Sequence, residues 1–226
     1  MKHLFCVEGF GGFPFGKSRI PKEIRNISDL VSGIGPAQVL NFVIPLMNDW
    51  PDVKWYYYPQ FAVWPILIKI SSMLKQKEFL DGSDSISLIG FSYGGSAVHR
   101  IAHSFREQVF DTVITLDPVG KWRLNVTPDD SNAYRFCKSE SVRRWINLYQ
   151  RIDKCSFAPR HKYITKAIWG GQVHGADSET ELTANDFRPE YVFNNGFPEI
   201  ANFFDQAHLW FPAQNEVIRQ ITNAFR

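Results

Sequence analysis

Apolar and polar residues along the first half of the chain follow two alternating periods. Short apolar runs bounded by turn residues indicate buried strands, at 4–10, 53–61, 85–92 and 112–119. Segments between and after them space their apolar residues as helices do, at 21–31, 36–50, 65–80 and 97–110. Near-continuous apolar strands alternating with helices predict an α/β fold, with a mostly parallel sheet flanked by helices on both faces.

Beyond residue 120 the pattern loosens. We expect further strands at 144–150 and 164–169, and a closing amphipathic helix at 213–225. The stretch 120–210 is otherwise rich in loops and could cover a substrate site. Because the sequence shows no repeat, linker or low-complexity tract, we expect a single domain over 1–226.

Charge, apolar run length and cysteine spacing argue against several classes of function. The net charge of +2, from 25 basic and 23 acidic residues, argues against binding to nucleic acid. No apolar run approaches the roughly 18 residues of a membrane span, and the short N-terminal run carries Glu8, unlike a signal peptide. The three cysteines lack pairing or metal-type spacing, so we expect reduced thiols in a cytoplasmic protein.

The most informative motif is Gly90-Phe91-Ser92-Tyr93-Gly94, a match to G-x-S-x-G. In that motif the serine occupies a sharp, strained turn between a strand and a helix, where its hydroxyl is presented above the sheet edge. Flanking glycines are needed because a β-carbon would collide with the neighbouring strand and helix. The context fits, since an apolar strand precedes Ser92 and small residues open a helix after it.

With this elbow and a glycine-rich loop after the first strand, the sequence resembles the α/β-hydrolase superfamily, in its lipase and esterase branch. The resemblance implies a catalytic triad in the chain order serine, acid, histidine. Asp117, at the end of the strand after the elbow helix, is the favoured acid, and Asp153 is the alternative. His208, just before the closing helix, is the favoured base, and His174, in a glycine loop, is the runner-up.

The remaining histidines carry weaker signals. His161 lies in a basic stretch and is expected at the surface. His99 and His103 are one helical turn apart, a spacing that suits a metal. No carboxylate or cysteine complements them in the sequence pattern, so we expect ordinary helix residues and no metal site.

The string GGFPFGKS, Gly11–Ser18, matches the phosphate-binding loop G-x-x-x-x-G-K-[ST] and would make the chain a P-loop nucleotide binder. Pro14 supplies no N–H to such a cradle, and Pro21 is the better helix start, so a helix begun at Lys17 would be interrupted almost at once. The resemblance assigns the loop to an oxyanion hole instead. The N–H groups of Phe10 and Tyr93 would then be the donors, although Glu8 stands where the superfamily often has histidine.

Together these features predict a serine esterase of lipase type. Aromatic residues of the back half, Trp210 among them, together with Gly11 and His174, are candidates to contact a small-molecule or lipid ester. Acyl transfer through Ser92 needs no cofactor and no metal. A thioesterase or acyltransferase would use the same residues, and a non-catalytic relative would keep only the fold.

Overall fold

A computed structural model of the chain describes residues 1–9, 50, 52–58, 62–118, 136–150, 171–183, 186, 211 and 214–225. Its centre is a six-stranded sheet in the order β2-β1-β3-β4-β6-β8, and every neighbouring pair in it is parallel. The strands are β1 (Lys2–Val7), β2 (Val53–Tyr58), β3 (Ser85–Phe91), β4 (Phe110–Leu116), β6 (Val142–Gln150) and β8 (Ser178–Leu182). The predicted α/β class with a mostly parallel sheet is therefore confirmed.

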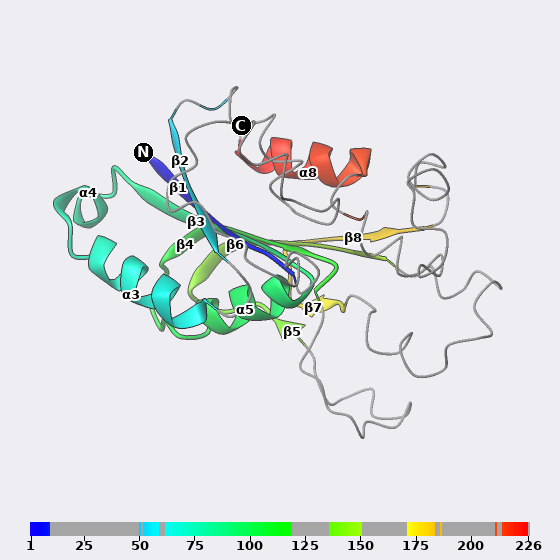
Figure 1. Cartoon of the computed structure of the whole chain (residues 1–226), viewed down its shortest axis with the longest axis horizontal. Coiled ribbons are helices and arrows are strands. Elements are labelled where there is room, and N and C mark those ends of the chain that lie inside the picture. The colour runs from blue at the N-terminus through cyan, green and yellow to red at the C-terminus, as the bar shows by residue number, and fades with distance from the viewer. Residues whose placement is uncertain are drawn as a thin grey trace, which may run out of the picture.

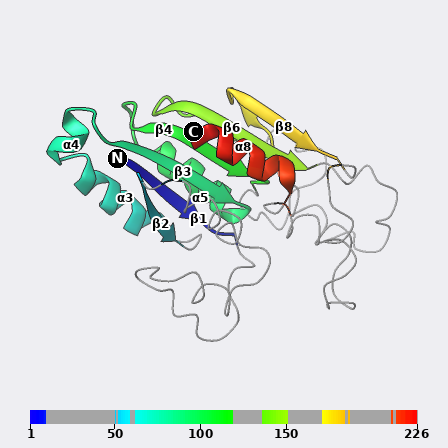
Figure 2. The ribbon, with the colours of Figure 1, turned by 90° about the horizontal axis from the view of Figure 1, so that it is seen from above.

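Helices cover both faces of this sheet (Figure 1). On one face lie α3 (Val63–Met73) and α5 (Tyr93–Ala102), with the short α4 (Lys77–Leu80) beyond α3. The opposite face carries α8 (Asn215–Phe225), which crosses over the middle strands in the view from above (Figure 2). A separate pair of two-residue parallel strands, β5 (Phe136–Cys137) and β7 (Val173–His174), lies beside α5.

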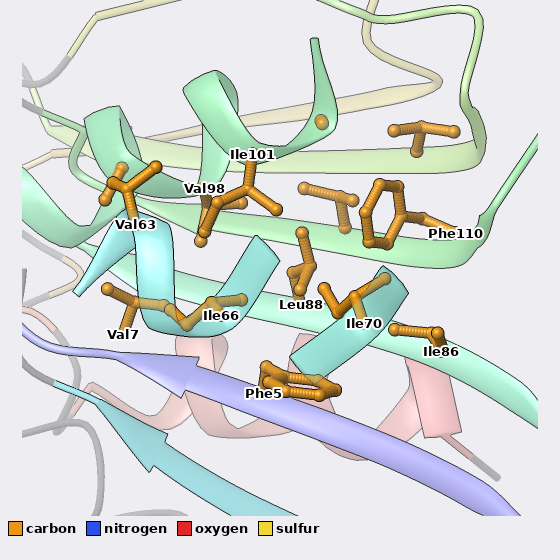
Figure 3. Close-up of a cluster of buried hydrophobic side chains, with 14 of the residues drawn as sticks. Phe5, Val7, Val63, Ile66, Ile70, Ile86, Leu88, Val98, Ile101 and Phe110 are labelled. Atoms are coloured by element: carbon orange, nitrogen blue, oxygen red, sulfur yellow. The ribbon is translucent and has the colours of Figure 1, made fainter. Parts of the chain in front are cut away.

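Period-two alternation along the strands builds two cores. In β1, Leu4 and Cys6 belong to the cluster under α8, whereas Phe5 and Val7 pack with residues of α3 and α5 (Figure 3). Both sets are at most 1% exposed, because each face of the strand is covered by a helix layer. This double burial explains why the central strands are apolar without interruption.

The structure corrects the predicted helix boundaries. The helix expected over 65–80 is two helices, because Gln76 is extended (φ −81°, ψ 150°) between α3 and α4. The helix expected over 97–110 begins at Tyr93 and ends at Ala102, and Phe110 already belongs to β4. Starting the helix directly after Ser92 leaves no residue between strand and helix except the serine itself.

Some of the remaining predicted helices and strands lie within the described residues, and others lie outside them. The strands expected near 4–10, 53–61, 85–92, 112–119 and 144–150 and the helix at 213–225 are confirmed with small shifts. The helix at 21–31, the strand at 164–169 and the segment 36–49 lie outside the described residues. Within the described part of the chain, all helices are too short or too polar to cross a membrane.

Candidate functional site

Ser92 occupies a strained turn between β3 and α5. Its backbone has φ 55° and ψ −122°, and it is one of two non-glycine residues with positive φ among those described. Such a conformation is costly for a residue with a β-carbon and persists only where the surroundings impose it. The residue is 4% exposed. The sequence-predicted elbow conformation is therefore present at this serine.

The glycines on either side of Ser92 are required by close packing. A β-carbon on Gly90 would lie 2.4 Å from the carbonyl oxygen of Gly94, inside the first turn of α5. A β-carbon on Gly94 would lie 2.1 Å from the carbonyl oxygen of Val7, at the end of β1. These contacts bring the start of α5 against both β3 and β1, as the G-x-S-x-G motif predicts.

The segment after β1 also reaches the serine. A β-carbon on Gly9 would lie 2.6 Å from Cβ of Ser92 and 3.2 Å from its Oγ. Only a residue without a side chain fits at this point, so the glycine loop begins in contact with Ser92. Phe10 and Gly11, the next two residues of that loop, lie outside the described residues.

Asp117 ends the neighbouring strand at the same sheet edge. The backbone N–H of Ser92 donates to the carbonyl of Leu116 over 2.9 Å, so Asp117 follows directly from the residue paired with the elbow. Asp117 is fully buried and has φ 42°. Its carboxylate accepts hydrogen bonds from the backbone N–H of Gln150 at 3.2 Å and from the side-chain amide of Gln150 at 3.4 Å.

Packing after Asp117 ties it to the elbow helix. A β-carbon on Gly95 would lie 2.6 Å from Cβ of Pro118, so the residue after the aspartate rests on the first turn of α5. Ser92 and Asp117 thus lie at the carboxyl ends of adjacent parallel strands, the usual location of ligand sites in open α/β sheets. Asp153, the alternative acid, lies outside the described residues.

A second buried carboxylate, Glu8, lies one residue before Gly9 and is 1% exposed. Burial, and then the negative charge of Glu8, raise the pKa of both the Cys6 thiol and the Tyr57 hydroxyl. Cys6 therefore stays a thiol and is a poor nucleophile. Burial also raises the pKa of Tyr93, so its hydroxyl stays protonated at neutral pH.

The histidine candidates are only partly within the described chain. His174 is exposed and lies on β7, where it pairs in register with Cys137, rather than in a glycine loop. Cys137 contacts His99, which follows Ser92 by seven residues, a rise of about 10 Å along α5. His174 thus belongs to the region beside the later turns of α5. His208, His161, Trp210 and the segment 11–18 lie outside the described residues.

The structure also brings a cysteine close to two histidines that are distant from it in the sequence. Cys137 on β5 lies against His99 of α5 and against His103, the residue directly after α5, and the three side chains form a group that could hold a metal ion. The expectation that no cysteine complements the two histidines was therefore wrong. Its cause is tertiary: Cys137 is 34 residues beyond His103, and only the i, i+4 spacing of the histidines gave a local signal.

Comparisons of the chain with models of protein families, with curated proteins and with solved structures gave no match.

Proposed function

We propose that this protein is a serine hydrolase of the α/β-hydrolase fold, which cleaves a carboxylic ester through an acyl-enzyme. The observation that carries the proposal is the backbone of Ser92, held at φ 55° between a buried strand and a helix. A strained, sterically enforced turn at a serine is expensive, and presenting a nucleophile is the function that explains its cost.

The proposed reaction starts with attack of the Ser92 Oγ on the ester carbonyl carbon. His208 takes the serine proton and returns it to the leaving alcohol, while Asp117 orients the imidazole and stabilises its charged form. Water then attacks the acyl-enzyme with His208 again as the base, which releases the acid and restores Ser92. No metal or cofactor takes part in these steps.

Stabilisation of the tetrahedral intermediate is assigned to backbone N–H groups. Tyr93 opens α5 directly after the nucleophile, so its N–H and the positive end of the helix dipole would face the oxyanion. Phe10 would supply the second N–H. Support for this part comes from Gly9, whose missing side chain lets the loop after β1 approach Ser92.

A thioesterase or an acyltransferase would use the same residues, since these differ only in the leaving group or in the molecule that attacks the acyl-enzyme. The competing P-loop proposal uses Gly11–Ser18 for phosphate and gives no reason for the strained Ser92 or for the close contact of Gly9 with it. The hydrolase proposal accounts for both features with one site.

The test is covalent labelling with a fluorophosphonate probe, in which the Ser92 Oγ would displace fluoride from phosphorus. We expect the folded wild type to be labelled, the Ser92→Ala variant to show no labelling, and the Ser96→Ala variant to be labelled as wild type. Ser96 is a matched control because it lies on α5 one turn after Ser92. A well-folded wild type that resists labelling would refute the proposal, and nucleotide binding with and without Lys17→Ala would then be measured.

The identity of the acid gives a second prediction. Asp117→Asn should lower kcat for a nitrophenyl ester by about 10⁴-fold, because loss of the orienting carboxylate leaves the histidine in the wrong tautomer. Asparagine keeps the shape of the side chain and tolerates the positive φ of this position. Asp153→Asn is the comparison. A large loss in that variant, with Asp117→Asn nearly unaffected, would move the acid to the end of β6.

A further inference from the structure

The geometry points to a metal site between α5 and β5, and we propose that His99, His103 and Cys137 together bind a zinc-type divalent cation. This site is separate from the elbow and does not depend on the proposed hydrolase activity. Each of the three residues offers one ligand atom, and these atoms all lie within 4.8 Å of one another.

The distances are those of a site that needs little rearrangement. The sulfur of Cys137 lies 3.7 Å from Nε2 of His103 and 4.0 Å from Nε2 of His99. In a tetrahedral zinc site with ordinary bond lengths, sulfur and nitrogen ligands are about 3.6 Å apart. The centroids of the two imidazole rings are 4.3 Å apart, a separation that the i, i+4 spacing allows.

Ligand chemistry also favours zinc. Thiolate and imidazole are soft to borderline donors, which select zinc over magnesium or calcium. The ammonium of Lys138, the residue after Cys137, is paired with the carboxylate of Asp177 at 2.6 Å, so its charge is already balanced.

The backbone of Cys137 forms a hydrogen bond with each of the two imidazoles. Its N–H donates to Nε2 of His99 over 3.3 Å, and its carbonyl accepts from Nε2 of His103 at 2.9 Å. Metal binding would exchange these hydrogen bonds for coordinate bonds. The proton on Nε2 of His103 would move to Nδ1 by exchange with solvent, which frees the Nε2 lone pair, and the Cys137 thiol would lose its proton to the solvent. Three protein ligands leave the fourth position of a tetrahedral ion to a water molecule.

Aromatic side chains beside the site hold the imidazole of His99 in place. His99 contacts the rings of Phe136 and Trp145 edge-on, with centroids 5.2 Å and 6.0 Å away. A bound ion would join β5 to α5, and α5 is the helix that directly follows Ser92. Zinc should therefore stabilise the fold as well as bind to it.

The experiment is titration of chelator-treated full-length protein with Co²⁺, whose thiolate-to-metal absorption reports a cysteine ligand, followed by displacement with Zn²⁺. We expect this absorption in the wild type, its loss in Cys137→Ser, and a fall in Co²⁺ affinity in His103→Gln. Loss of a direct ligand should exceed the roughly 10–100-fold cost of losing an outer partner. Zn²⁺ should also raise the melting temperature of the wild type but not of Cys137→Ser.

Two control variants match these changes. Cys6→Ala removes a thiol buried in the sheet, and Arg100→Gln changes an exposed residue of the same helix. Both should keep the wild-type absorption. Because His103 is exposed, His103→Gln should stay folded and remains informative if Cys137→Ser does not, as circular dichroism will show. The proposal is overturned if folded wild type gives no thiolate absorption, or if His103→Gln binds Co²⁺ with wild-type affinity.

Discussion

Replacing Ser92 with Ala should lower kcat for a short-chain nitrophenyl ester by about 10⁶-fold, and His208→Ala should lower it by a similar factor. The double variant should be no slower than either single variant. The physical reason is that the hydroxyl and the imidazole act as one unit, since the proton leaves the serine only as the histidine accepts it. Residual hydrolysis would come from the oxyanion donors and from binding alone.

Single-turnover and steady-state rates of the three variants measure this non-additivity, with His174→Ala as the comparison for the base. If His174→Ala abolishes turnover while His208→Ala does not, the base is reassigned within the same enzyme class. If the losses of Ser92→Ala and His208→Ala multiply in the double variant, the two residues act independently and the triad is wrong.

Gly94→Ala should destabilise the protein by about 3 kcal/mol, although helix propensity alone predicts the opposite sign. Alanine in place of glycine within a helix normally stabilises by about 1 kcal/mol. At Gly94, however, the new β-carbon would lie 2.1 Å from the carbonyl oxygen of Val7, which belongs to a strand held by β2 and β3. Backbone cannot move aside as a flexible side chain can, so α5 must shift away from β1.

The measurement is the melting temperature, which should fall by about 10 °C for a chain of this size. Gly82→Ala is the control, because Gly82 has a positive φ of 75° but open space around its position. That change should cost only about 1 kcal/mol, the strain of the backbone without a collision. A Gly94→Ala variant as stable as the wild type would show that β1 and α5 are not in contact.

The central strands could be predicted because both of their faces are buried. β1, β3, β4 and β6 carry apolar residues at successive positions, a pattern that few other structures produce. β8 was not predicted from the sequence, because most of its residues are not buried. Its sequence, SETEL, is polar because it is an edge strand with only its last residue buried, and its pairing with β6 comes from tertiary contact alone.

The same division applies to the candidate site. Ser92 and its glycines were predictable because the elbow is local, and the steric need for each glycine lies within a few residues or on the adjacent strand. Cys137 was not, since its approach to His99 depends on where β5 is placed beside α5. The sequence spacing indicates the two histidine ligands, whereas the cysteine ligand can be identified only from the fold.

The strand order also bears on how the protein folds during synthesis. After β3, the described strands β4, β6 and β8 each join the sheet at its growing edge in chain order, and α3 and α5 cover one face early. The other face, with Leu4, Ile89 and Ile114 among its residues, packs against α8, which is made after all of these strands. Among the described elements only α8 covers this face, so without α8 the described strands present a broad apolar surface, at which chaperone binding would compete with aggregation.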